Sequence, residues 1–238
     1  SIETQRLDAF VDAAFAFAVS LLIIAGGEPL RSYNDLLAAL ARIPAFAGGF
    51  ALIIMFWLAH RTWSSLSPVR NGGTTLLSLT VVLAVLVFVF PLRLLVETAT
   101  HFLSGGLLPG RGLISSFAEL RGTYVIYGIG FAVLSGLYVM LFRQARRTLD
   151  PSDKARRADA ASWSRTWILA MGAGLASSLV ACTPVLASAP WLPGVTYQLI
   201  PLGIGLFALW DRHRLRGVPR DLTAPDVRRG RSPPTTGP

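Results

Sequence analysis

The chain has 238 residues, of which 53% are hydrophobic and only 15% are charged. A typical soluble domain carries about 25% charged residues, so this composition excludes a soluble enzyme with an ordinary water-facing surface. The net charge of +9 does not indicate a nucleic-acid partner, because the basic residues are confined to short connectors and the C-terminal tail between long apolar runs. The composition therefore predicts an all-α, polytopic integral membrane protein whose main partner is the lipid bilayer.

Six segments are apolar enough to cross a hydrocarbon core of about 30 Å, which takes about 20 residues of helix. They are residues 7–25, 44–66, 74–96, 117–142, 163–187 and 195–210. Residues 1–216 are therefore predicted to form a six-helix transmembrane domain. Residues 217–238 are rich in Pro, Gly, Thr and Arg, which predicts a disordered basic cytoplasmic tail, either solvated or in contact with anionic headgroups. A cleaved signal peptide is rejected for the first segment, because its apolar stretch is long and Asp8 and Asp12 sit where such peptides avoid acids.

The basic residues alternate between the connectors. The N-terminus, the second and fourth connectors and the segment after the last span hold seventeen of the 22 Lys and Arg residues, and the other three connectors hold five. Because positively charged loops stay in the cytoplasm, both termini are predicted to be cytoplasmic. An even number of spans requires the same arrangement.

A few polar residues lie inside the predicted spans, where a charged group costs about 2.5–3.5 kcal/mol on insertion scales and normally faces protein or water. Asp12 lies near the cytoplasmic start of the first span, where it is either an interfacial cap favoured by the helix dipole or part of a network. Trp57 and His60 lie at i and i+3 at the cytoplasmic end of the second span, on one helix face. Two antiparallel neighbours would bring Asp12 near both, which we state as a hypothesis. Arg93 and Glu97, at i and i+4, are expected to form an interfacial pair at the outer end of the third span.

The first span carries a distinct stripe when it is drawn as a helix at about 100° per residue. Ala13, Phe17, Ser20, Leu21 and Ile24 fall within one sector, whereas Asp12 lies on a different side. This face is apolar with a single hydroxyl. From periodicity alone, it is either ordinary lipid-facing or core surface, or a surface with a function of its own.

The first span resembles the first-helix signature of the transmembrane protein 175 potassium channel family. That signature is Arg, three residues, Phe-Ser-Asp and then an alternating Phe-Ala-Ile-Ala type run ending in Thr-Leu. The corresponding stretch here begins at Arg6 with Phe10, Val11 and Asp12 and continues to Leu22. Phe56, Trp57 and His60 in the second span and Phe90-Pro91 in the third also resemble that family.

The resemblance implies a homotetramer of six-span subunits in a bacterial plasma membrane, with the four first helices lining a pore for potassium and other monovalent cations. By position, Phe17 would form the main constriction, Ser20 the polar layer beside it and Ile24 the next apolar layer, with Leu21 and Ala13 on the same face. Arg6, Phe10, Asp12, Trp57 and His60 would hold the first helix against its neighbours. Two positions depart from the pattern: Val11 replaces the motif serine, and Phe17 replaces the usual Leu or Ile.

The function predicted from the sequence is therefore a potassium-permeable channel with an apolar constriction. The alternatives are a secondary transporter, which the absence of matching broken spans in the two halves disfavours, and a membrane protein without conduction. An intramembrane enzyme is disfavoured because His60, His101 and His213 are dispersed and no HExxH motif occurs. The single cysteine, Cys182, excludes an intramolecular disulfide and a cysteine-rich metal site. No cofactor or metal is expected apart from the permeant potassium ion.

Overall fold

The structure is a computed structural model that describes residues 2–24, 31–67, 70–110, 114 and 116–216. All secondary structure in these ranges is helical, as the sequence predicts. The long helices are α1 (Ile2–Ile24), α3 (Ile43–Leu66), α4 (Gly72–Leu103), α5 (Phe117–Thr148), α6 (Lys154–Ala181) and α9 (Leu199–Arg216). The short ones are α2 (Tyr33–Ala41), α7 (Val185–Ser188), α8 (Leu192–Val195) and the 3-10 turn η1 (Thr196–Gln198). The predicted tail, residues 217–238, lies outside the described residues.

Polar side chains define where several of these helices begin. Asn71 accepts a hydrogen bond from the Thr74 backbone N–H, and the Thr74 hydroxyl accepts one from the Asn71 N–H, which is a reciprocal capping box at the start of α4. Ser116 and Asp153 accept bonds from backbone N–H groups in the first turns of α5 and α6. The caps satisfy backbone N–H groups in the first turns that have no partner within their own helix.

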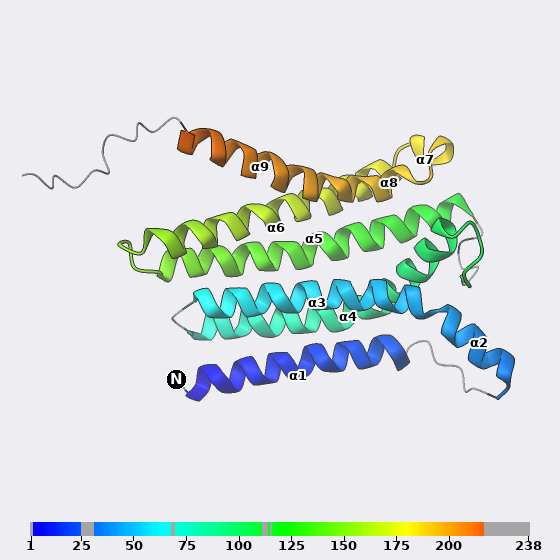
Figure 1. Cartoon of the computed structure of the whole chain (residues 1–238), viewed down its shortest axis with the longest axis horizontal. Coiled ribbons are helices and arrows are strands. Elements are labelled where there is room, and N and C mark those ends of the chain that lie inside the picture. The colour runs from blue at the N-terminus through cyan, green and yellow to red at the C-terminus, as the bar shows by residue number, and fades with distance from the viewer. Residues whose placement is uncertain (1, 25–30, 68–69, 111–113, 115, 217–238) are drawn as a thin grey trace, which may run out of the picture.

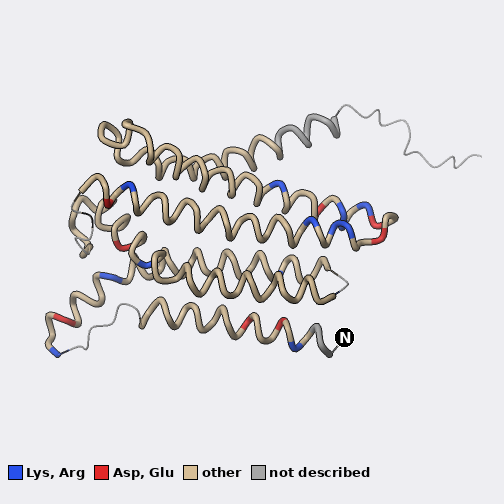
Figure 2. The backbone as a smooth tube through the Cα atoms, turned by 180° about the vertical axis from the view of Figure 1, so that it is seen from behind, with Lys and Arg blue, Asp and Glu red and all other residues tan. Residues whose placement is uncertain are grey.

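The long helices run roughly along one axis and pack in succession (Figure 1). α1 lies at one edge against α3 and α4, α5 packs on α4 and α3, α6 packs on α5, and α9 packs on α6. The start of α1, the connection from α3 to α4 and the connection from α5 to α6 lie at one end, here called the N-terminal end. α2, α7 and α8 lie at the far end. Figure 2 shows Lys and Arg residues gathered along the chain around the connection from α5 to α6, at the N-terminal end.

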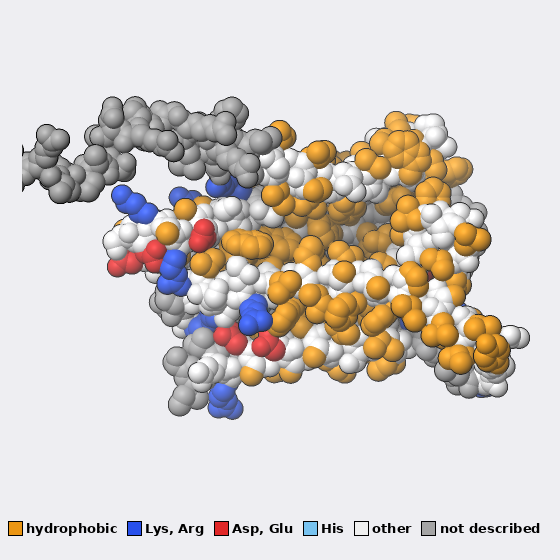
Figure 3. Space-filling model, in the orientation of Figure 1, with side chains coloured by type: hydrophobic (Ala, Val, Ile, Leu, Met, Phe, Trp, Pro, Cys, Tyr) orange, Lys and Arg blue, Asp and Glu red, His pale blue; other side chains and the backbone are white. Residues whose placement is uncertain are grey.

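Four of the described helices are long and apolar enough to cross a membrane: α1 over Gln5–Ile24, α3, α4 and α5. They carry the first four spans predicted from the sequence. The broad apolar surface in Figure 3, with charged side chains gathered at the N-terminal end, fits a membrane protein. The fifth predicted span is wrong at its end, because α6 stops at Ala181 and the residues up to 187 form a turn and part of α7. Pro184 has no N–H to donate and disfavours a helical conformation at Thr183, which favours an end of α6 before it.

Stacked aromatic rings hold the middle of the bundle together. The rings of Phe56 on α3, Tyr138 on α5 and Trp167 on α6 stack with centroids 4.6–5.9 Å apart. The buried Tyr138 hydroxyl donates to the Phe56 carbonyl at 2.6 Å, so this phenol has a partner in the apolar interior. These contacts tie α3 to the pair formed by α5 and α6.

A proline, Pro91, lies inside the continuous helix α4 and removes one of its backbone hydrogen bonds. Pro91 cannot donate to the preceding turn, and four residues later the Leu95 N–H donates to the Tyr127 hydroxyl of α5 at 2.9 Å. Arg93 and Glu97 form the predicted i, i+4 pair at 2.8 Å. Their side chains are only 13% and 5% exposed, so the pair is buried in the bundle rather than extended into an interface.

Small residues bring α5 and α6 close together. Gly128, Ala132 and Gly136 recur at intervals of four on α5, a spacing that permits close approach within or between subunits. The structure uses this surface within the subunit: a Cβ atom on Gly128 would lie 2.5 Å from the Gly174 carbonyl oxygen, and one on Gly174 would lie 2.7 Å from the Gly128 carbonyl oxygen.

We expect Gly128→Ala to destabilise the subunit by about 1–3 kcal/mol, because the added methyl group must push two helix backbones apart. The apparent melting temperature of the detergent-solubilised protein measures this. Gly172→Ala is the matched control, since a Cβ atom at Gly172 on α6 meets nothing within 4 Å. Equal melting temperatures for the two variants would contradict the close packing described here.

Candidate pore helix and the polar contacts that hold it

One face of α1 packs into the bundle. Val11, Phe15, Ala18 and Leu22 are buried, with exposures of 0–3%, and their spacing of three or four residues places them on one side of the helix. Apolar burial gives little driving force in lipid, where association depends on close packing and polar contacts. Gly49 on α3 supplies such packing, because a Cβ atom there would lie 2.9 Å from the Leu22 side chain.

The opposite face of α1 is not covered by the parts of the chain that the structure describes. The side chains of Ala13, Phe17, Ser20 and Ile24 are exposed, and Leu21 is half-buried. Phe17 is 54% exposed and Ile24 67%. Only 22% of the apolar window of α1 is buried, against 56% for α5, so α1 is the most open of the four candidate spans. The residues of the stripe predicted from the sequence thus share an uncovered face, while their contact with a pore stays a prediction.

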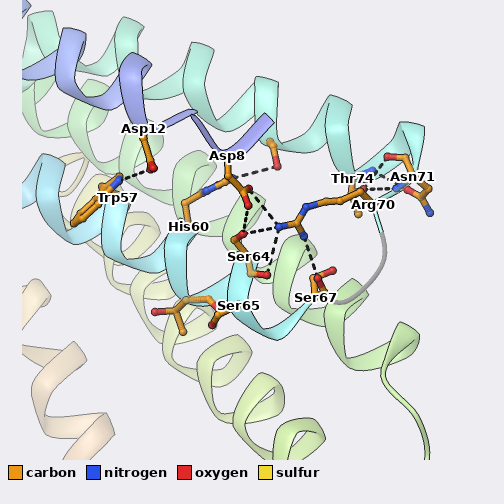
Figure 4. Close-up of polar contacts among 12 residues, drawn as sticks. Asp8, Asp12, Trp57, His60, Ser64, Ser65, Ser67, Arg70, Asn71 and Thr74 are labelled. Carbon is orange, nitrogen blue, oxygen red and sulfur yellow. Dashed lines mark hydrogen bonds and ion pairs between the residues drawn. The ribbon is translucent and has the colours of Figure 1, made fainter. Parts of the chain in front are cut away.

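A hydrogen bond joins α1 to α3 near the N-terminal end (Figure 4). The Trp57 indole N–H donates to the Asp12 carboxylate at 2.8 Å. The guanidinium of Arg61 lies 5.4 Å from the centre of the Trp57 ring. Of the two interpretations of Asp12 that the sequence leaves open, the structure supports the network, in which Trp57 is the partner. A charge-assisted bond of this kind is stronger than one between neutral groups.

His60 lies on a different side of α3 from the Asp12 contact. Its Nε2 atom is 3.2 Å from the Ser78 hydroxyl of α4, and its ring packs against those of Trp63 and Phe15. His60 is 3% exposed. The hypothesis that Asp12 lies near both residues is thus supported by a hydrogen bond for Trp57, whereas the hydrogen-bond partner of His60 is Ser78, at the junction of α1, α3 and α4.

Arg6 and Phe10, the other two residues of the predicted packing motif, have exposed side chains. Phe10 is 55% exposed, whereas Val11, which stands in place of the motif serine, is completely buried. The structure therefore brings Asp12, Trp57 and His60 to the interface around α3 and leaves Arg6 and Phe10 outside it. The functional roles of all five residues remain predictions.

A second polar cluster, which was not predicted from the sequence, lies one helical turn closer to the N-terminal end than the bond between Asp12 and Trp57 (Figure 4). The Ser64 hydroxyl donates to one Asp8 oxygen at 2.8 Å, and Arg70 donates to the other at 3.3 Å. The Arg70 guanidinium also lies 4.3 Å from the centre of the Trp63 ring. A signal was present: Asp8 and Asp12 are four residues apart on α1, and Trp57 and Ser64 are seven apart on α3, so each pair shares a helix face. Within the described ranges, no three His, Cys, Asp or Glu side chains are grouped so that they could hold a metal ion.

Comparison with known families gives one assignment for the N-terminal part of the chain. Residues 6–91 match the family described as endosomal/lysosomal potassium channel TMEM175. A curated protein of Marivirga tractuosa named potassium channel is 30% identical over 151 residues. That match covers 59% of this chain and 59% of the relative, so the chain spans less than two thirds of its curated relative.

Two solved structures resemble the fold over most of its length. A crystal structure of a variant of the potassium channel MtTMEM175, in complex with a nanobody-MBP fusion protein, has a TM-score of 0.69. It is 22% identical, and the match covers 89% of this chain and 93% of that one. A lysosomal potassium-selective channel TMEM175 homolog from Chamaesiphon minutus has a TM-score of 0.60 at 22% identity, covering 87% of this chain and 98% of that one. The likeness shows that this chain has the fold of those channels, and the resemblance predicted from the first span is confirmed.

We expect Asp12 and Trp57 to be energetically coupled by about 1.5–3 kcal/mol, the range for hydrogen bonds to charged groups. A double-mutant cycle of Asp12→Ala and Trp57→Phe, read from the free energy of unfolding in detergent, measures the coupling. The control cycle pairs Asp12→Ala with Trp163→Phe on α6. If the two cycles give the same near-zero coupling, the bond has no energetic role.

Proposed function

We propose that this chain is a member of the TMEM175 family and forms a potassium-permeable cation channel in which the first helix of each subunit lines the pore. The family is one of channels rather than enzymes, which supports a protein without a catalytic site. The observation that carries the proposal is the uncovered stripe of α1, with Phe17 and Ile24 exposed on a helix that is held from the other side only. In a bilayer such a stripe contacts either lipid or another subunit, and the proposal assigns it to contacts around a pore axis.

A pore on one helix requires several copies of that helix around an axis. One subunit cannot enclose a channel with α1 alone, so the proposal includes a homo-oligomer, and the family resemblance favours four copies. Successive layers of Phe17, Ser20 and Ile24 would then lie about 4.5 and 6 Å apart along the axis, at 1.5 Å per residue. The bilayer, identical subunits and monovalent cations are the proposed partners.

The chemistry of these layers suggests how conduction is controlled. A narrow ring of apolar side chains expels water, and an ion that would lose its hydration there cannot pass. Four Phe17 rings would form such a barrier, and their faces would weakly attract a cation once the ring widens. The Ser20 hydroxyl, which donates to the Ala16 carbonyl at 3.2 Å in this structure, offers an oxygen atom to a partly dehydrated ion in the next layer.

The proposal also includes six spans with both termini in the cytoplasm of a bacterial plasma membrane. Four spans are supported by length and hydropathy, and α6 and the stretch from η1 into α9 would supply the other two. Supporting this topology, the start of α1 and the connections α3–α4 and α5–α6 lie at one end of the bundle. That end also has the basic cluster between α5 and α6, as expected for the cytoplasmic side.

We expect Phe17→Ala to raise potassium flux in proteoliposomes by at least about tenfold, since loss of a dewetting barrier of 1.4 kcal/mol already has that effect. Discrimination against sodium should weaken, because a wider ring strips less water from the ion. The flux assay under a potassium/sodium gradient measures both quantities.

Ile23→Ala is the matched control for this test. Ile23 is 57% exposed, close to the value for Phe17, but lies about 120° around the helix from it. If the two substitutions change potassium flux equally, Phe17 does not form the constriction of the pore. Gradient-driven substrate movement without single-channel currents would favour a secondary transporter, and no movement at all a non-conducting membrane protein.

Labelling of cysteines in intact cells tests the topology. Cys182 is exposed at the end of α6 and should react with a membrane-impermeant maleimide added from outside. Ser152→Cys in a Cys182→Ser background places the only thiol in the connection between α5 and α6, which should react only after the membrane is permeabilised. The reverse pattern would invert the orientation.

A further inference from the structure

We propose that Asp8, Ser64 and Arg70 form a tether that positions the cytoplasmic end of the pore helix and thereby sets how often the constriction opens. The inference rests on the proposed function for its link to conduction. It deepens that function by adding a positioning residue, Arg70, that lies outside the first helix.

Arg70 is fixed on the corner between α3 and α4. Its guanidinium donates to the backbone carbonyls of Ser64 and Ser67 at 3.3–3.4 Å and stacks over the Trp63 ring. Its side chain is only 7% exposed. The corner therefore presents a fixed positive charge that is largely removed from water.

Asp8 brings α1 to this fixed charge. One of its oxygen atoms accepts a bond from Ser64 at 2.8 Å and the other lies 3.3 Å from Arg70. Asp8 is 33% exposed, so it is the less buried partner. Removing the carboxylate would leave a buried cation without its counter-charge, which is more costly than losing an exposed ion pair.

The tether accounts for the missing motif serine. Val11 offers no hydroxyl to a neighbouring helix and is completely buried. Asp8 lies three residues earlier, next to Val11 on the helix surface. Its carboxylate accepts a hydrogen bond from the Ser64 hydroxyl of α3. The hydroxyl contact is therefore made about one turn closer to the N-terminal end, with the carboxylate on α1 and the hydroxyl on the neighbour.

Because of its position, a change in the tether would displace the constriction residue Phe17. Asp8 precedes Phe17 by nine residues in one continuous helix, which is about 14 Å along the axis. Asp12 and Trp57 join α1 to α3 nine residues before α3 ends, whereas the tether joins α1 to the end of α3 and to Arg70, just before α4. A shift of the N-terminal end of α1 away from this turn would tilt the helix about the Asp12 contact and move Phe17 relative to its copies.

Single-channel recording and hydrogen–deuterium exchange on the full-length protein test the proposal together. We expect Asp8→Asn and Arg70→Gln each to change the open probability by at least about fivefold, the lower end of typical couplings between sites. The unitary conductance should stay as in the wild type, because no constriction residue changes. Amides of residues 5–12 should exchange faster in both variants, and Asp8→Glu, which keeps the carboxylate, should restore both properties toward wild type.

The control is a second Arg–carboxylate pair that cannot hold α1. Arg93 and Glu97 lie within α4 itself, so Arg93→Gln/Glu97→Gln should leave the exchange of residues 5–12 unchanged. The matched double variant Asp8→Asn/Arg70→Gln should show effects smaller than the sum of its two single substitutions.

If Asp8→Asn has the same open probability and the same amide exchange in residues 5–12 as the wild type, the proposed tether is wrong. A loss in unitary conductance with unchanged open probability would also overturn it, because that result would place Asp8 in the ion path. The proposed function fails separately: if the wild-type protein passes no potassium, the channel is lost, while faster exchange of residues 5–12 in the variants would still support the tether.

Discussion

The proposed channel function depends on one constraint, which is that α1 is attached to the subunit on one side. Val11, Phe15, Ala18 and Leu22 pack against α3 and α4, and the other side of the helix is left exposed by the described residues. Within a bilayer, apolar side chains gain little by leaving lipid for protein, so α1 depends on close packing at Gly49 and on polar bonds to α3. The same arrangement that holds the helix therefore leaves Phe17, Ser20 and Ile24 available to other copies.

α3 connects this helix to the rest of the bundle. Its side toward α1 carries Trp57 and Ser64, and Phe56, one residue from Trp57, points into the aromatic stack with Tyr138 and Trp167. The stack and the glycine contact between α5 and α6 make that side of the molecule closely packed. α1 is thus less enclosed than the closely packed helices α5 and α6 to which α3 connects it.

Hydropathy was sufficient to find α1, α3, α4 and α5, because long apolar runs satisfy their backbone only as helices in lipid. The bond between Asp12 and Trp57 also followed, since both residues lie near the same end of antiparallel neighbours. The sequence did not reveal α2, whose nine residues are too few to stand out, or the end of α6 before Pro184. The bond of His60 to Ser78 was not predicted, because the angle between two residues on one helix does not say which neighbour each will meet. Arg70 was counted only as a topology signal, because its partner Asp8 is remote in sequence.

The proline in α4 places a mechanical boundary inside the subunit. The Leu95 N–H beyond Pro91 bonds to the Tyr127 hydroxyl, so the far end of α4 is splinted by α5, whereas the start of α4 adjoins the corner that carries Arg70. Bending at Pro91 would strain that splint, and a rigid α4 would carry α5 along with any displacement at its start. The Tyr127 bond therefore couples the position of α5 to that of α4 on the far side of the proline.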